Sequence, residues 1–141
     1  MRYLIDTNIV LFVLTDQEQL TRETEDILND YNNQIYVPAE AIKELIHLYQ
    51  SGKLEVRKWK IARDIVDFIK DANFEIKSPR EEHLKTLADL PLLPDHKDPS
   101  DRMIIAQAIT ENIPIISSDR KFINYREFGL ELIFNKRGRA T

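Results

Sequence analysis

The sequence predicts an α/β fold, a three-layer α/β/α sandwich in which helices cover both faces of a central, mainly parallel sheet. Short apolar runs of strand length alternate along the chain with segments whose apolar residues recur at helical spacing. The chain has only three glycines, and no linker, repeat or low-complexity stretch interrupts this alternation. Strands that alternate with helices form parallel sheets. A length of 141 residues suits a single domain over residues 1–141.

The first elements of the alternation are a strand, two helices and a second strand. Residues 2–5 are a short apolar run that ends at an aspartate. A helix is expected from residue 7 or 8 to about residue 14, and a second over residues 21–31. Residues 35–37 are the second strand, because two asparagines precede them and Pro38 follows.

The middle of the chain predicts two helices, a weak strand and the start of another helix. Pro38 suits the first turn of a helix that ends near Gly52. The apolar residues from Trp59 to Ile69 have the spacing of an amphipathic helix. Residues 74–76 form a weak strand. A serine, a proline and a glutamate within residues 78–81 together predict a helix start with a capping box.

The last third predicts a loop, a long helix and two strands. Residues 90–99 contain three prolines and are expected to form the loop. A helix follows over residues 100–110, and residues 114–117 form a strand. A short helical turn over residues 122–125 leads to a final strand over residues 130–134.

Composition excludes several classes of protein. The chain has no cysteine, so it has neither disulfides nor thiolate metal sites, which is compatible with a cytoplasmic location. Its N-terminus does not read as a signal peptide, and no segment approaches the roughly 18 apolar residues of a membrane span. The net charge of −4 argues against coating nucleic acid by bulk charge.

Acidic residues stand beside the predicted strands and helix starts. Asp6 and Asp119 each follow a strand, Asp101 opens a helix, and Glu44 lies on the second turn of another. Ligands of open α/β sheets bind beyond the carboxyl ends of the strands. These four carboxylates are therefore expected to converge there and to hold a divalent cation. Asp98 would add a fifth acid at the edge.

Each acid also has a purely structural interpretation. Asp6 and Asp119 would serve as helix N-caps or turn residues, and Asp98, which precedes a proline, favours the N-cap role over metal ligation. Most helical glutamates such as Glu44 are solvated. His96 is a candidate general acid, but a solvated or structural loop histidine is favoured.

With these motifs in place, the chain resembles the PIN-domain ribonucleases and, among them, the VapC-type toxins of type II toxin–antitoxin systems. The resemblance covers nearly the whole chain in order. It is carried by Tyr3-Leu4-Ile5-Asp6-Thr7-Asn8, by the stretch from Ile35-Tyr36-Val37 through Glu44 to Gly52-Lys53-Leu54, by Leu90-Pro91, by the run from His96 to Ala108, and by Ile115-Ile116-Ser117-Ser118-Asp119 with Phe122 and Tyr125.

The resemblance implies a set of site residues. The acidic cluster that binds Mg²⁺ or Mn²⁺ in the family is matched by Asp6, Glu44, Asp101 and Asp119. Supporting or accessory positions are matched by Asn8, Ser117, Asp98 and Arg102. Two positions depart from the pattern, because Ser100 replaces an aromatic residue and Lys43 replaces a tryptophan. Neither departure removes a carboxylate, but both bear on substrate choice and partner docking.

The resemblance also implies a function and partners. It implies a metal-dependent endoribonuclease with an RNA substrate, a VapB-like antitoxin and a homodimeric state, with no membrane association. An RNA-processing PIN nuclease without an antitoxin is the nearest alternative.

Local basic residues are the candidates for RNA contact. One group follows the Glu44 helix and comprises Lys53, Arg57, Lys58, Lys60 and Arg63. A second group is the C-terminal tail with Lys136, Arg137 and Arg139. A solvated face and a frayed end explain these groups nearly as well as RNA contact does.

Two functions of other classes also use an aspartate after the first strand. An aspartyl phosphotransferase of the haloacid-dehalogenase type would require a second aspartate two positions after Asp6, where Asn8 stands. A receiver-like signalling module would require an acidic pair after the first strand and a lysine after a late one. Formation of a covalent phosphate on Asp6 would distinguish either one from a nuclease.

Overall fold

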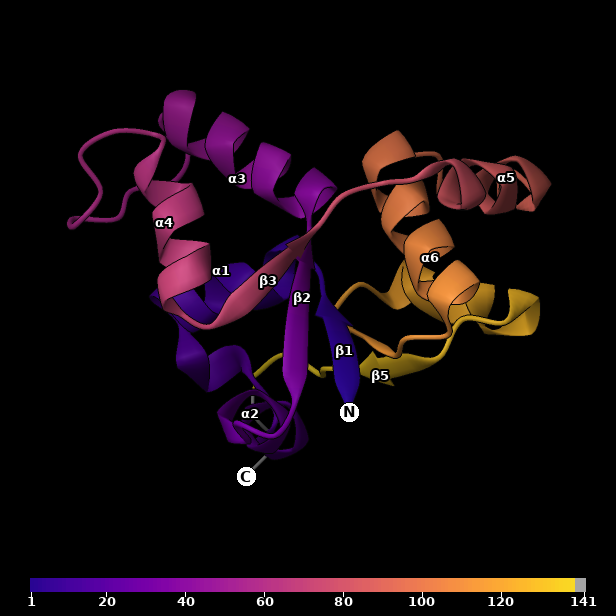
Figure 1. The fold of residues 1–141 in the computed structure, drawn as a ribbon, viewed down its shortest axis with the longest axis horizontal. Helices are drawn as coiled ribbons and strands as arrows, with labels where there is room; N and C mark the ends of the chain where they lie inside the picture. Colours follow the sequence, from indigo (N-terminus) through magenta and orange to yellow (C-terminus); the bar gives the residue numbers. More distant parts are fainter. Residues whose placement is uncertain (139–141) are drawn as a thin grey trace.

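A five-stranded parallel sheet lies at the centre of the molecule, with the strands in the order β3-β2-β1-β4-β5 (Figure 1). The computed structural model describes residues 1–138. The strands are β1 (Arg2–Ile5), β2 (Gln34–Pro38), β3 (Phe74–Lys77), β4 (Ile115–Ser117) and β5 (Leu132–Phe134). All four strand pairs are parallel. The predicted α/β class with a parallel sheet is confirmed.

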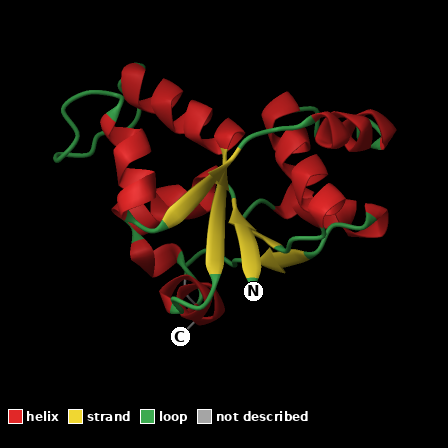
Figure 2. Ribbon diagram, in the orientation of Figure 1, coloured by secondary structure: helices red, strands yellow, loops and turns green. Residues whose placement is uncertain are grey.

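Helices cover both faces of this sheet. They are α1 (Thr7–Thr15), α2 (Arg22–Asn29), α3 (Ala39–Gln50), α4 (Asp64–Asp71), α5 (Glu81–Asp89) and α6 (Pro99–Glu111), with 3₁₀ helices η1 (Gln17–Gln19) and η2 (Arg120–Phe128). Figure 2 shows α1, α3 and α4 on one side of the sheet and α5, α6 and η2 on the other. Right-handed crossovers require this division, because the chain moves outward from β1 to β3 and then returns past β1 to β4.

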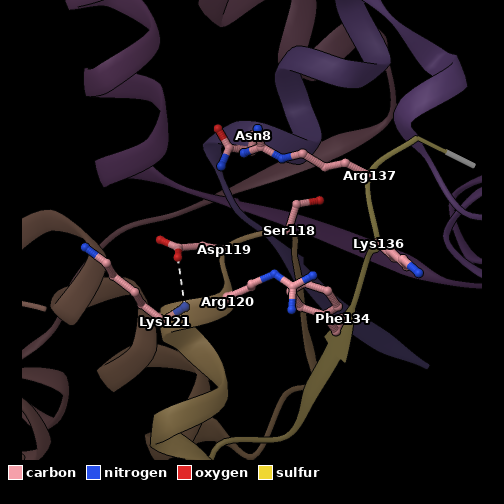
Figure 3. Close-up of a pocket in the computed structure, with 8 residues that line it drawn as sticks. All are labelled: Asn8, Ser118, Asp119, Arg120, Lys121, Phe134, Lys136 and Arg137. Atoms are coloured by element: carbon pink, nitrogen blue, oxygen red, sulfur yellow. Dashed lines mark hydrogen bonds between the residues drawn. The ribbon is translucent and has the colours of Figure 1, made fainter. Parts of the chain in front are cut away.

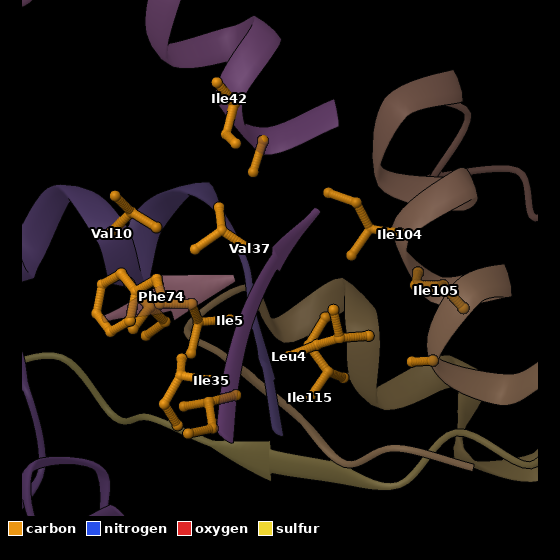
Figure 4. Close-up of a cluster of buried hydrophobic side chains, with 14 of the residues drawn as sticks. Leu4, Ile5, Val10, Ile35, Val37, Ile42, Phe74, Ile104, Ile105 and Ile115 are labelled. Carbon is orange, nitrogen blue, oxygen red and sulfur yellow. The ribbon is translucent and has the colours of Figure 1, made fainter. Parts of the chain in front are cut away.

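The core lies between the sheet and these helices. Leu4, Ile5 and Ile115 on the central strands are fully buried, as are Val10 on α1 and Ile105 on α6 (Figure 4). Strands of a parallel sheet that are covered on both faces carry such continuous apolar runs. The core therefore holds the carboxyl ends of β1 and β4 rigidly beside the starts of α1 and η2.

The helix predicted over Trp59 to Ile69 begins later than expected, at Asp64. The Asp64 carboxylate accepts hydrogen bonds from the backbone N–H groups of Lys60 and Ile61, which closes a turn in place of a helical start. Trp59 lies in the loop before the turn, where it is buried against the edges of Tyr49 and Phe68.

Two predicted helix starts are also shifted. Ser78 does not cap α5; the N-cap residue is Arg80, whose N–H donates to Nδ1 of the buried His83 at 2.8 Å. Pro38 is the last residue of β2 and the N-cap of α3 instead of a residue of its first turn. Gly52 has the left-handed φ of +78° expected just after a helix end.

The remaining elements follow the sequence closely. Helix α6 begins at Pro99, one residue earlier than predicted, and the predicted turn over residues 122–125 is part of the longer η2. Among the described residues, no helix combines the length and the apolar character that crossing a membrane requires.

Candidate active site

Asp6 stands at the carboxyl end of the central strand β1 and is almost completely buried. One carboxylate oxygen caps α1 by accepting from the N–H of Ile9, and the other accepts from the Ser117 hydroxyl. Strands β1 and β4 pair with Ile5 opposite Ile116, so their next residues, Asp6 and Ser117, come side by side. The Asp6 side chain therefore caps α1 and also lies at the carboxyl edge of the sheet, where the acids were expected to converge.

The pKa of Asp6 depends on its burial and on the groups around it. Burial, with a smaller effect from the negative charges of Asp101 and Asp119, raises the pKa of Asp6 to about 7, although the hydrogen bonds from Ser117 and Ile9 act in the opposite direction. Three carboxylates from distant parts of the chain thus share one electrostatic environment.

Asp101 lies in the first turn of α6, where Asp98 is the N-cap. The Asp98 side chain accepts from the N–H of Asp101 at 3.0 Å, which confirms the capping role favoured for Asp98. Burial and then the charge of Asp98 raise the pKa of Asp101 to about 6, and the nearby His96 opposes this rise.

Asp119 follows β4 and caps η2 through the N–H of Lys121 at 2.9 Å. The Ser117 hydroxyl accepts from the N–H of Asp119 at 3.0 Å while it donates to Asp6. This one hydroxyl therefore connects the Asp6 carboxylate with the backbone of Asp119, the first and the last acid of the predicted cluster.

His96 is the residue that sequence reasoning underrated. It is buried, its Nδ1 lies 2.7 Å from the Tyr125 hydroxyl, and its Nε2 lies 3.4 Å from Asp101. One ligand atom from each of His96, Asp101 and Asp119 lies within 4.8 Å of the others. The only local signal was its position shortly before the Asp98 to Asp101 helix start.

Glu44 lies apart from that group. Its side chain is exposed on α3, and one oxygen accepts from the Thr7 hydroxyl at 2.9 Å. Because Thr7 adjoins Asp6, this hydrogen bond holds Glu44 on the rim of the acidic cluster. Its role as a ligand stays a prediction.

Asn8 and Arg102 occupy different surroundings. Asn8 lines an open hollow beside Asp119 (Figure 3). Arg102 donates to the carbonyl of Leu90 at 3.0 Å and so ties the proline-rich loop to α6. Asn8 thus lies beside Asp119, and Arg102 lies at the junction of α6 with the loop; the supporting roles of both stay predictions.

The donor set fits a divalent cation. Carboxylate oxygens suit Mg²⁺, and an imidazole beside them suits Mn²⁺ as well. Within residues 1–138, His96 is the only basic side chain within 4.0 Å of the carboxylates of Asp6, Asp101 or Asp119. Burial first, and the charges of neighbouring carboxylates second, raise the pKa values of Asp6 and Asp101, so a cation bound beside them would favour their charged forms. The cluster of His96, Asp101 and Asp119 is consistent with a metal site.

Solved structures with the same fold include chains from VapBC and FitAcB structures of bacteria. A chain of VapBC2 from Rickettsia felis, bound to a promoter DNA fragment, has 20% identity and a TM-score of 0.68, with 95% of this chain and 98% of that chain covered. A chain of VapBC-1 from Haemophilus influenzae has 15% identity and a TM-score of 0.65, with the same coverage. A chain of FitAcB from Neisseria gonorrhoeae has 18% identity and a TM-score of 0.62, with 94% and 96% covered.

At these identities the structures show the fold alone, and a comparison with curated protein sequences found no significant match. The family model described as "PIN domain" matches residues 3–127, which is most of the chain. The family predicted from the motifs is thereby confirmed: the chain belongs to the PIN domain family.

Proposed function

We propose that this chain is a metal-dependent endoribonuclease and the toxin of a type II toxin–antitoxin module. It would cleave RNA phosphodiesters with Mg²⁺ or Mn²⁺ held by Asp6, Glu44, Asp101 and Asp119 within one PIN domain. The observation that carries the proposal is the convergence of Asp6, Asp101 and Asp119 on one edge of the sheet, where burial and mutual repulsion raise the pKa of Asp6 to about 7. PIN domains are typically nucleases.

The division of labour among the residues follows from their contacts. Asp101 and Asp119 would present oxygens to the cation, and Asp6 would add a negative charge at a position that its hydrogen bond with Ser117 fixes. His96 contacts the Asp101 carboxylate and would orient it. Glu44 would add a carboxylate at the edge of the cluster, where it accepts a hydrogen bond from the Thr7 hydroxyl. When bound, a divalent cation lowers the pKa of water and balances the charge of a leaving oxyanion.

Cleavage of a mixed RNA pool with Mg²⁺, with Mn²⁺ and with EDTA tests this function. Asp101→Asn should reduce cleavage at least about a hundredfold if the carboxylate holds the ion. The matched control is Asp89→Asn, an exposed carboxylate at the end of α5, which should cut at the wild-type rate. Full activity in EDTA would refute the mechanism, and a covalent phosphate on Asp6 would favour the phosphotransferase or receiver alternative.

We further propose a VapB-like antitoxin and a homodimer, both in the cytoplasm. Support comes from the similar solved chains, which belong to VapBC and FitAcB complexes. The partly buried apolar residues Leu11, Phe12, Val13 and Leu14 on α1 offer surface for a partner. An antitoxin arginine near Asp6 and Asp119 would match the negative charge there.

Static light scattering of the purified chain tests the homodimer, and a monomer at micromolar concentration would refute it. Titration with the protein encoded beside this chain tests the antitoxin. Inhibition that weakens as Mg²⁺ rises is expected. A nuclease with no inhibiting neighbour would favour the RNA-processing alternative.

A further inference from the structure

A hollow of about 610 Å³ opens beside Asp119, between the start of α1 and residues 134–137 (Figure 3). Asn8 and Ser118 supply neutral polar groups, and Arg120, Lys136 and Arg137 supply positive charge. A strongly basic wall directly beside an acidic cluster is unexpected in a chain whose net charge is −4.

The C-terminal segment that brings in two of these cations is firmly attached. Asn135 is fully buried, accepts from the N–H of Thr21 at 2.7 Å, and donates to the carbonyl of Gln19 and to the Ser118 hydroxyl. The N–H of Gly138 donates to the Gln19 side chain at 2.9 Å. A frayed end, one of the two interpretations of the basic tail, is therefore wrong for residues 135–138. Arg139 lies outside the described residues.

Both arginines of the hollow rest on aromatic rings. The Arg137 guanidinium lies 5.4 Å from the centre of the Phe12 ring, and that of Arg120 lies 5.7 Å from the centre of the Phe134 ring. In Figure 3, Arg137 runs towards Asn8 on one side of Ser118, and Arg120 lies beside Phe134 on the other.

The described residues offer these cations no carboxylate partner. Within residues 1–138, no Asp or Glu side chain forms an ion pair with Arg120, Lys136 or Arg137, although ion pairs form elsewhere in the chain. Guanidinium groups that are pre-positioned on rings and lack anions lose little freedom when they bind a phosphate.

We propose that this hollow is a phosphate-binding subsite for single-stranded RNA, in which Arg120, Lys136 and Arg137 hold backbone phosphates next to the bond that is cut. The proposal rests on the proposed nuclease function, because it deepens the substrate contacts of that same site. Arginine binds phosphate through two parallel hydrogen bonds, and a single strand can follow a curved row of cations. The subsite would hold the strand while the acidic cluster next to it repels bare phosphate.

The test compares two double variants of equal charge in an Asp101→Asn background, in which RNA should not be cut. Arg120→Gln with Arg137→Gln removes the guanidinium groups of the hollow. Lys70→Gln with Lys85→Gln removes two exposed cations elsewhere. Fluorescence anisotropy with a short labelled oligouridylate measures affinity over a range of salt concentrations.

The hollow variant should bind the oligouridylate at least about tenfold more weakly than its background, since two guanidinium groups no longer pair with phosphates. The slope of log affinity against log salt concentration should become less negative by about 0.7 for each phosphate that is no longer neutralised. The control variant should keep the affinity within about twofold, because isolated surface charges contribute little. Equal affinity and slope in the two variants would overturn the proposal.

Two further outcomes separate this proposal from the proposed function. Weaker binding by the hollow variant, combined with a wild-type chain that cuts no RNA, supports the subsite while the nuclease proposal fails. RNA cleavage by the wild type, combined with unchanged RNA binding by the hollow variant, refutes the subsite alone. Binding of labelled polyglutamate is measured in the same way. If the hollow variant loses polyglutamate binding but keeps its RNA binding, the proposal is overturned, because the hollow would then bind an acidic protein segment.

Discussion

At the scale of single residues, Asp6 combines two demands that oppose each other. Its carboxylate caps α1 and receives the Ser117 hydroxyl, which favour the charged form, yet burial beside Asp101 and Asp119 favours the neutral form. Burial prevails, since the pKa of Asp6 rises to about 7 from an ordinary 3.8. Without a bound metal, the charged form of Asp6 therefore lowers the free energy of unfolding of the chain.

Replacing Asp6 by asparagine should remove that cost. Asp6→Asn keeps an oxygen that can cap α1 but carries no charge. In EDTA at pH 8, its free energy of unfolding should rise by about 1–3 kcal/mol, since each pKa unit corresponds to about 1.4 kcal/mol. Urea unfolding measures this change, and RNA cleavage should be lost. Asp26→Asn, an exposed change on α2, is the control, and a less stable Asp6→Asn would contradict the account.

His96 is the second residue whose contacts lead to a prediction. Tyr125→Phe removes the hydroxyl 2.7 Å from the His96 Nδ1, so the ring loses the partner that orients its other nitrogen towards Asp101. Stability should fall by about 1 kcal/mol, the usual value of one hydrogen bond. If His96 positions Asp101, kcat for RNA cleavage should fall several-fold with KM nearly unchanged. The exposed pair of Tyr36 and Gln34 provides the control Tyr36→Phe, and an unchanged kcat would make His96 a packing residue only.

At the scale of elements, local signals determined what could be predicted. Four strands are largely apolar runs, β3 alternates apolar and charged residues, and each of the five was located to within about two residues, the usual uncertainty of a strand end. The starts of α4 and α5 were misplaced for physical reasons. Asp64 closes a turn onto Lys60 and Ile61, and Arg80, whose N–H donates to the buried His83, takes the N-cap position assigned to Ser78. Neither contact has a signature in the spacing of apolar residues.

The candidate site likewise contains some residues that the sequence could place and others that it could not. Asp6 and Asp119 could be placed because a parallel sheet gathers the ends of its strands at one edge. The contact of His96 with Tyr125 spans 29 positions, and that of Asn135 with Thr21 spans 114. Such contacts depend on how the elements pack, so the sequence alone did not reveal the buried histidine or the anchored C-terminal segment.

Asn135 gives the prediction at this scale, because it joins β5 to the turn before α2 and to Ser118. Asn135→Ala leaves the N–H of Thr21 and the carbonyl of Gln19 without their partner. The free energy of unfolding should fall by about 2–4 kcal/mol, since buried polar groups lose their hydrogen bonds. Hydrogen exchange of residues 135–138 should quicken. Asn32→Ala, in an exposed turn, should change neither quantity, and slow exchange in Asn135→Ala would show that other contacts hold the segment.

At the scale of the whole molecule, folding itself creates the charge density of the site. The unfolded chain keeps Asp6, Asp101 and Asp119 far apart, whereas the sheet and α6 bring them into one field. Any cation that binds only the folded chain then stabilises it in proportion to the logarithm of its concentration relative to its dissociation constant. Stability, proton binding and metal binding are therefore linked through the same carboxylates.

The pH dependence of stability should reveal this linkage. Asp6 has a folded pKa of about 7 and an ordinary pKa of 3.8, so between these values the folded chain binds the proton more tightly. Its contribution to stability is full below about pH 4 and is lost as pH rises through about 7. In EDTA, the difference in unfolding free energy between wild type and Asp6→Asn should therefore widen from pH 5 to pH 8, with wild type falling behind. Urea unfolding at each pH measures this difference.

Saturating Mg²⁺ should narrow the difference between wild type and Asp6→Asn at pH 8, because the cation stabilises the charged carboxylate. A difference that is constant with pH in EDTA would mean that Asp6 is already charged in the folded chain at pH 5, against the crowding of acids on which the proposed metal site depends.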